Sequence, residues 1–267
     1  MRIALIVEYD GTNYHGFQYQ KNVLTVQEEL EKSIYKLEKK KIRVKASGRT
    51  DAGVHALGQM ISFDTDSNYP SEVFLKALNY YLPEDICIKK SYIVRDDFDP
   101  RKDAKSRLYR YVIQKSQIRS PFLKNRVLTI SEDLDTEIMS QGASLFLGIH
   151  DFTRFTTPMA LRETTPVRNI LRSEIVKNRD LINYMVEGNA FLMHQVRRMT
   201  GSLLDLGRHV IKLDDLIGMI ECSNKIISNS LPPYGLYLQK VYYEEEFDDY
   251  VASDYLEVVR PTFDKGI

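Results

Sequence analysis

The stretch KASGRTDAGVHALGQ places one carboxylate in a short loop between glycines. Asp51 lies between Gly48 and Gly53, with Arg49 before it and His55 after it. An aspartate in such a loop often makes a turn with its own backbone. A carboxylate that faces a cleft beside an arginine can instead remain ionised and act as a covalent nucleophile, as aspartate does in glycosyl chemistry. Both roles remain open for Asp51, and Arg49 is either a surface cation or a side chain that enters a nucleic acid.

A second candidate lies in the stretch NAFLMHQVRRMTGSLLDLG, where the apolar residues recur at helical spacing. On such a helix His194, Arg197 and Gly201 share one face, next to a largely apolar stripe. A charged side chain beside a buried stripe needs a partner, because burying it unpaired is costly. Asp51 is the most clearly presented loop acid, and we expect Arg197 to pair with it.

The stretch RLYRY is predicted to be a strand, with Arg107, Tyr109 and Tyr111 on one face and Arg110 on the other. Aromatic residues are common in half-buried strands, which is an ordinary explanation for both tyrosines. Alternatively, Tyr109 is a platform on which a base stacks, worth roughly 1–3 kcal/mol. Alternating basic and aromatic residues on a sheet face suit single-stranded or flipped RNA.

The charge distribution is compatible with a polyanionic partner. The 267 residues carry no net charge, yet residues 244–267 hold eight acids and two bases. The rest of the chain has 35 Lys and Arg against 29 Asp and Glu, a net charge of +6. Basic groups in 39–45, 101–110 and 115–126 predict a discontinuous surface that tracks phosphates. The candidate substrate-binding residues are Arg49, His55, Lys105, Arg107, Tyr109 and Arg110.

Composition also excludes several classes of protein. Cys87 and Cys222 stand alone, without a CxxC motif or a Cys/His cluster, so neither a disulfide framework nor a metal site is expected. No apolar run approaches the length needed to span a bilayer, and the N-terminal apolar patch is too short for a signal peptide. We therefore expect a cytoplasmic protein without a membrane segment.

Hydrophobic periodicity predicts an α+β fold. The first half has the order β-α-β-β-α-β of a ferredoxin-like unit, and the second half repeats it with insertions. We expect two ferredoxin-like (RRM-like) domains with mainly antiparallel sheets and a central cleft. Residues 1–104 would form the first domain, with the Asp51 loop, 105–245 the second, and 246–267 an acidic tail. The predicted strands are 3–9, a strand beginning at 42–44, 59–64, 86–94, 107–114, 168–176, 181–187 and 236–243, and the predicted helices are 26–37, 71–82, 134–147, 189–206 and 213–222.

Several motifs, in order, resemble those of the TruA-type tRNA pseudouridine synthases. They cover most of the chain, and the motif around Asp51 is the most specific. The family often has Trp where this chain has Phe17 and Glu where it has Tyr234, and the residues after Glu245 have no family counterpart. The motifs are EYDGTNYHGFQYQ, TVQEELE, SGRTDAGVHALGQ, DDFDPRKDAKSRLYRYVI, HDFTRF, TPVRNI, NAFLMHQVRRMTGSLLDLG and PPYGLYL.

The resemblance implies an activity and roles for the candidate residues. Such enzymes convert uridines of the tRNA anticodon stem-loop to pseudouridine without cofactor or metal, and they work as homodimers. Asp51 matches the essential aspartate and Arg49 the arginine that helps to displace the target nucleotide. Tyr109 matches the tyrosine packed against the uracil, and Arg197 matches the arginine paired with the catalytic acid.

Two other classes of protein are compatible with the same residues. A catalytically silent RNA-binding module would keep the basic cleft and Tyr109 but would not need Arg197 opposite Asp51. A nucleoside or sugar hydrolase would also use a carboxylate, yet no second acid lies at a convincing position to serve as its general acid.

Overall fold

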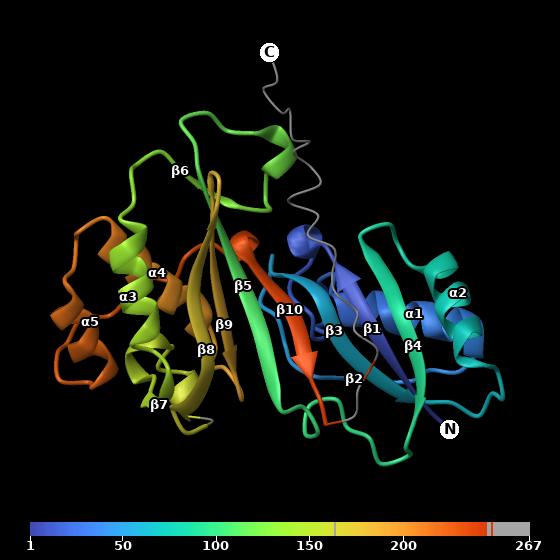
Figure 1. Ribbon diagram of the computed structural model, residues 1–267. Helices are drawn as coiled ribbons and strands as arrows, with labels where there is room; N and C mark the ends of the chain where they lie inside the picture. Colours follow the sequence, from blue (N-terminus) through green and yellow to red (C-terminus); the bar gives the residue numbers. More distant parts are fainter. Residues whose placement is uncertain (163, 245–246, 248–267) are drawn as a thin grey trace.

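One mixed, mostly antiparallel sheet runs through the protein in this computed structural model, which describes residues 1–162, 164–244 and 247 (Figure 1). Its strands follow the order β4-β1-β3-β10-β5-β9-β8-β7, with β2 paired to β3 and β6 paired to β5. The pairs β10–β3 and β5–β6 are parallel and the others are antiparallel. The strands are β1 (Arg2–Tyr9), β2 (Lys45–Ala46), β3 (His55–Asp64), β4 (Ile86–Val94), β5 (Ser106–Lys115), β6 (Leu128–Ile130), β7 (Gly148–Asp151), β8 (Val167–Asn178), β9 (Leu181–Gly188) and β10 (Leu236–Tyr242).

The described residues also form five α-helices, which pack in two groups. The first two helices lie near β4 and the other three near β8 (Figure 1). Side-chain caps define two starts: Thr25 accepts a hydrogen bond from the Glu28 amide, and Asp135 accepts from the Ile138 amide. The helices are α1 (Val26–Glu38), α2 (Ser71–Tyr81), α3 (Thr136–Ser144), α4 (Gln195–Gly207) and α5 (Leu213–Ile220).

The last strand of the sequence, β10, lies in the middle of the sheet. Its Leu238 is in register with Ala56 of β3 on one side and with Tyr109 of β5 on the other. A strand from the second half of the chain therefore joins the two halves edge to edge. The strands of the two expected halves therefore lie in one continuous, mostly antiparallel sheet.

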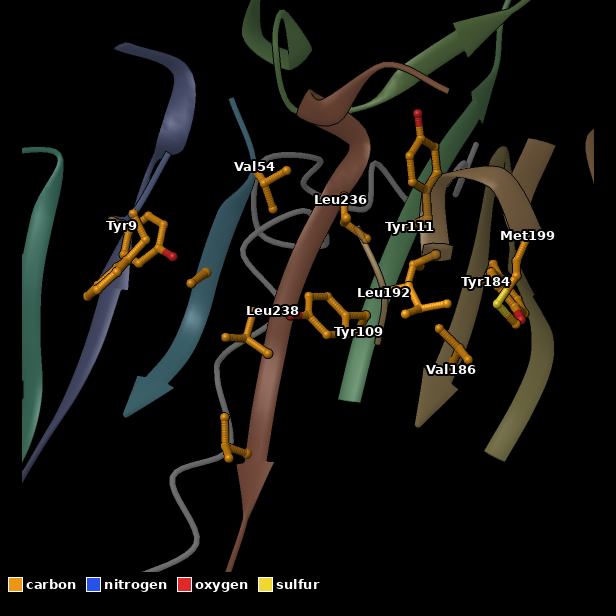
Figure 2. Packing of buried hydrophobic residues seen from close by; sticks show 14 of the residues in the cluster. Tyr9, Val54, Tyr109, Tyr111, Tyr184, Val186, Leu192, Met199, Leu236 and Leu238 are labelled. Carbon is orange, nitrogen blue, oxygen red and sulfur yellow. The ribbon is translucent and has the colours of Figure 1, made fainter. Parts of the chain in front are cut away.

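A single apolar cluster extends through both halves on one face of this sheet. Tyr9, Tyr109, Tyr184 and Leu238 belong to it, and all are at most 9% exposed (Figure 2). Because side chains alternate along a strand, neighbouring positions pack on the opposite face, where Tyr237 belongs to a smaller cluster. The position of a residue along its strand thus decides on which face of the sheet its side chain packs.

Most of the predicted elements are confirmed, and the errors lie at their ends. Strand β4 has its predicted bounds, while the strand predicted to begin at 42–44 begins at Lys45, because only the two residues of β2 pair with β3. Helix α4 begins at Gln195, six residues later than predicted, because His194 has a left-handed backbone. The short strands β6 and β7 were not predicted. The acidic tail predicted at 246–267 lies outside the described residues, apart from Phe247.

We expect Leu238→Ala to lower the free energy of unfolding by about 2–5 kcal/mol, because it removes a fully buried side chain from the strand that joins the halves. Urea unfolding followed by circular dichroism measures the change. Leu171→Ala is the matched control, since this leucine is 53% exposed on β8 and its loss should change stability by less than about 0.5 kcal/mol. Equal losses in the two variants would contradict the central role of β10.

Candidate active site

The Asp51 loop is held by backbone contacts with the segment that follows β1. The Phe17 amide donates to the Thr50 carbonyl at 3.1 Å, and the Gly53 amide donates to the Tyr14 carbonyl at 3.2 Å. Gly16 makes this approach possible: its φ is +91°, and a Cβ atom there would lie 2.7 Å from the Thr50 carbonyl oxygen. The loop is therefore fixed on both sides of Asp51.

The carboxylate of Asp51 contacts two side chains from the start of α4. Nη1 of Arg197 lies 3.0 Å from Oδ2 of Asp51, so the structure contains the expected pair. The Nε atom of Arg197 donates to the Leu231 carbonyl at 2.7 Å, which fixes the guanidinium in a second direction. Nε2 of His194 lies 3.6 Å from the same carboxylate oxygen, a distance longer than a hydrogen bond.

Asp51 faces a cleft of about 1320 Å³. Among the described residues that line the cleft, Asp51 is the only acid, and six arginines surround it. Arg168 is the most buried of the six, and burial lowers the pKa of its guanidinium. The cleft therefore presents positive charge around a single carboxylate. The six arginines are Arg43, Arg49, Arg101, Arg107, Arg168 and Arg197.

Tyr109 lines the cleft from β5 and is buried. Its ring packs edge-on against Phe191 with centroids 5.2 Å apart. Burial, together with the charge of Asp51, raises the pKa of Tyr109 to about 12, although Arg107 opposes the shift. At neutral pH the hydroxyl keeps its proton, and the ring presents a flat apolar surface beside the carboxylate.

The other basic candidates lie at different depths. Arg49 is exposed in the cleft, and its guanidinium has no ion-pair or hydrogen-bond partner in the described part of the chain. Arg107 also lines the cleft but donates to several main-chain carbonyls, among them those of Ser47 and Asn189. Lys105 lies outside the lining of the cleft and contacts Glu244 at 3.2 Å.

Besides Lys105, two more of the predicted substrate-binding residues, His55 and Arg110, lie outside the cleft. His55 is 2% exposed, accepts a hydrogen bond from the Gly11 amide on Nδ1 and donates from Nε2 to the Asn125 carbonyl at 2.8 Å. The His55 ring stacks on Tyr237, and the guanidinium of Arg110 lies over the ring of the same tyrosine, 5.5 Å from its centroid. Because side chains alternate along β5, Arg110 and Tyr109 point to opposite faces of the sheet.

The cleft is also lined by three residues that were not predicted from the sequence as site residues: His194, Phe191 and Arg168. The shared helical face of His194 and Arg197 was the available signal for the histidine. Phe191 lies in the same motif but before the helix, so periodicity gave it no face. Arg168 comes from β8, and no local pattern connects that strand with the Asp51 loop.

The described residues contain no cluster of three or more His, Cys, Asp or Glu side chains placed to hold a metal ion. Cys87 and Cys222 are free thiols. Within the described ranges, no helix has the length and apolar character needed to cross a membrane.

Comparison with known proteins identifies the family. The profile described as tRNA pseudouridine synthase matches residues 5–101 and 143–244, which include Asp51, His194 and Arg197. The chain is 42% identical over 242 residues to tRNA pseudouridine synthase A of Acetivibrio thermocellus, covering 90% of this chain and 99% of that protein. It is 41% identical to the protein of the same name from Exiguobacterium sp., covering 91% and 98% of the two chains. For that from Staphylococcus aureus strain MRSA252, identity is 39% and coverage is 92% and 93%.

A family profile that matches most of the chain defines its class, and relatives that align along almost their full length agree with it. The chain belongs to the tRNA pseudouridine synthase family.

We expect Gly16→Ala to lower the free energy of unfolding by more than about 1 kcal/mol, because the residue has a left-handed backbone and the new Cβ atom would meet the Thr50 carbonyl. Urea unfolding measures the loss. Gly48→Ala in the Asp51 loop is the control, since no heavy atom lies within 4 Å of the added Cβ atom. An unchanged stability of Gly16→Ala would show that this contact does not fix the loop.

Proposed function

We propose that this protein isomerises uridine to pseudouridine in tRNA, with Asp51 as the reacting carboxylate. The observation that carries the proposal is the position of Asp51: a lone acid in an arginine-lined cleft, paired with Arg197 at 3.0 Å. A silent RNA-binding module would have no use for a paired carboxylate at this place. Membership of the tRNA pseudouridine synthase family supports the same function.

The reaction conserves every atom of the uridine. The C1′–N1 bond breaks, the uracil turns, and C5 joins C1′. Asp51 either traps C1′ as the sugar acquires positive charge or removes a proton from the sugar, and both routes need a carboxylate held beside C1′. Arg197 would position that carboxylate, because Asp51 and the Leu231 carbonyl fix its guanidinium from two sides.

Arg49 and Tyr109 have complementary proposed roles. The target nucleotide must leave its stack, at a cost of a few kcal/mol, before C1′ can meet Asp51. Arg49 is exposed and unpaired within the described part of the chain, so it can enter the vacated space. Tyr109 would confine the detached uracil against its buried ring.

The arginine-lined cleft supports tRNA as the substrate, because guanidinium groups bind phosphates without reading sequence. We assign the anticodon stem-loop as the target region and a homodimer as the working form on the basis of the family resemblance. The exposed residues Arg49, Arg101 and Arg43 would meet the RNA first. Lys105 would act at the rim, while Arg107 would shape the cleft wall.

We also infer two ferredoxin-like domains, 1–104 and 105–245, within the continuous sheet. The strand order β4-β1-β3-β2 in the first half is matched by β10-β5-β9-β8 in the second. In both halves the chain enters by the second strand of this order and leaves by the first, with helices between. Asp51 belongs to the first unit and Arg197 to the second.

We expect Asp51→Asn to lower pseudouridine formation by more than about 10⁴-fold, as the loss of a nucleophile does in other enzymes. The tRNA affinity should be unchanged or slightly higher, because the substitution removes a negative charge from a positive cleft. Nucleoside analysis after incubation with unmodified tRNA measures the product, and filter binding measures affinity.

Asp66→Asn is the matched control, since Asp66 is an exposed carboxylate paired with Lys40 outside the cleft. Substantial turnover by Asp51→Asn would refute the proposal. Free uracil released by the wild-type protein would identify a hydrolase, and unchanged tRNA would identify a binding module.

We expect Arg49→Ala to lower the turnover rate more than the tRNA affinity, because extraction of the base follows docking. A tRNA whose target uridine lies opposite a mismatch should restore part of the lost rate, since a mismatched base costs less to unstack. Single-turnover rates on matched and mismatched tRNA measure the recovery. An equal loss of rate on both substrates would contradict a role of Arg49 in base extraction.

A further inference from the structure

His194 is the second side chain that reaches the carboxylate of Asp51. Its Nε2 atom lies 3.6 Å from the oxygen that Arg197 also contacts. The imidazole lines the cleft, and 31% of the side chain is exposed there. It is thus placed to meet the same part of a substrate that meets Asp51.

The backbone of His194 is held in an uncommon conformation. Its φ and ψ are 61° and 4°, in the left-handed region that residues other than glycine seldom adopt. Two hydrogen bonds close the turn: the Gln195 amide donates to the Leu192 carbonyl at 3.1 Å, and the Leu192 amide donates to the side-chain oxygen of Gln195 at 2.8 Å. Thr156 donates to the carbonyl of Met193 at 3.0 Å. These contacts fix the backbone from which the imidazole extends. Left-handed conformations of residues other than glycine concentrate at functional sites.

Pseudouridine formation requires a proton transfer in addition to the new carbon–carbon bond. Once C5 has joined C1′, the hydrogen on C5 must leave and N1 must gain one. By then Asp51 has left C1′ or has returned its proton to the sugar, so its carboxylate is restored. A base beside this carboxylate would be stabilised as it takes up the C5 proton.

We propose that His194 is that base, and that Asp51 stabilises the imidazolium that forms. This inference rests on the proposed function. The C5 proton moves to a ring nitrogen of His194, and the electron pair of the C5–H bond forms the C5–C6 double bond. The C6–N1 double bond gives its electron pair to N1, which takes a proton from the imidazolium or from water. One proton has then moved from C5 to N1.

The charged groups around the imidazole agree with this role. Burial lowers the pKa of His194, Asp51 opposes the shift, and Arg197 and Arg198 on α4 lower it further. The imidazole is therefore neutral at neutral pH and able to accept a proton. Tyr109 is the other candidate, but its pKa of about 12 leaves the hydroxyl protonated.

The decisive variant is His194→Asn, because asparagine accepts a left-handed backbone but is not a base. Single-turnover pseudouridine formation is measured on tRNA made with ordinary or 5-deuterated uridine. We expect the rate to fall by about 10²–10⁴-fold, and the ratio of the two rates to exceed that of the wild type, because C5–H cleavage becomes limiting. His209→Asn is the matched control: His209 is also left-handed (φ 56°) and lies 3.7 Å from the Asp135 carboxylate, outside the cleft.

The pH profile separates His194 from Tyr109. With His194 as the base, the wild-type rate falls as the pH drops through the lowered pKa of the imidazole, and it is level above that pKa. With Tyr109 as the base, the rate would keep rising toward pH 12. A wild-type rate and isotope ratio in His194→Asn, or an enlarged ratio in Tyr109→Phe alone, would overturn the inference.

A second variant tests the proposal if His194→Asn does not fold. His194→Gly also tolerates the left-handed turn, and added imidazole should restore its turnover but not that of Asp51→Asn. No rescue of folded His194→Gly would count against the proposal. The wild-type protein on the same tRNA tests the proposed function separately: absence of pseudouridine there refutes both, whereas wild-type product with an unimpaired His194→Asn refutes only the role of His194.

Discussion

The contact between Asp51 and Arg197 sets the constraint that the rest of the structure must satisfy. The two residues are 146 positions apart and come from different halves of the chain. Arg197 is only 12% exposed, so its guanidinium has given up most of its hydration, and one carboxylate that is itself a third exposed does not replace it. The Leu231 carbonyl supplies the second acceptor. A hydrogen-bonded ion pair tolerates shifts of only a few tenths of an ångström, so the loop and the helix must be held in a fixed relation.

The segment 231–234 and the strand that follows it meet this constraint. Three carbonyls of the segment accept hydrogen bonds, from Arg197 at 2.7 Å, from the Tyr111 hydroxyl at 2.8 Å and from His55 at 3.1 Å. The ring of Pro233 lies next to Gly53, where an added Cβ atom would lie 3.0 Å from the Cγ atom of the proline. One short segment therefore contacts α4, β5 and the residues that follow Asp51 in its loop before the chain enters β10 between the two halves. His55 belongs to this support of the loop, which explains why a histidine only four residues after Asp51 is buried outside the cleft.

The sequence predicted the elements that local periodicity specifies and the Asp51–Arg197 pair that charge burial requires. It could not predict that β10 would join the halves into one sheet, because a strand pairing over such a separation leaves no local pattern. The late start of α4 was missed for a related reason: His194 has the spacing of a helical residue, and only tertiary contacts fix its left-handed backbone. Arg110 was placed in the site from a basic cluster in the sequence, whereas strand alternation directs it away from Tyr109.

The arginines of the cleft differ in how many main-chain carbonyls hold their guanidinium groups. Arg107 donates to carbonyls of four residues, and Arg168 donates to those of Thr165 and Val167, so the fold itself orients both guanidiniums. Fixed charges attract a phosphate chain without a cost of ordering when it binds. Arg49 is without such anchors in the described part of the chain. Removing a base from its stack requires a side chain that can follow the nucleotide. The unanchored Arg49 beside Asp51 therefore suits the proposed extraction of the base, and the anchored Arg107 and Arg168 suit the proposed binding of the RNA.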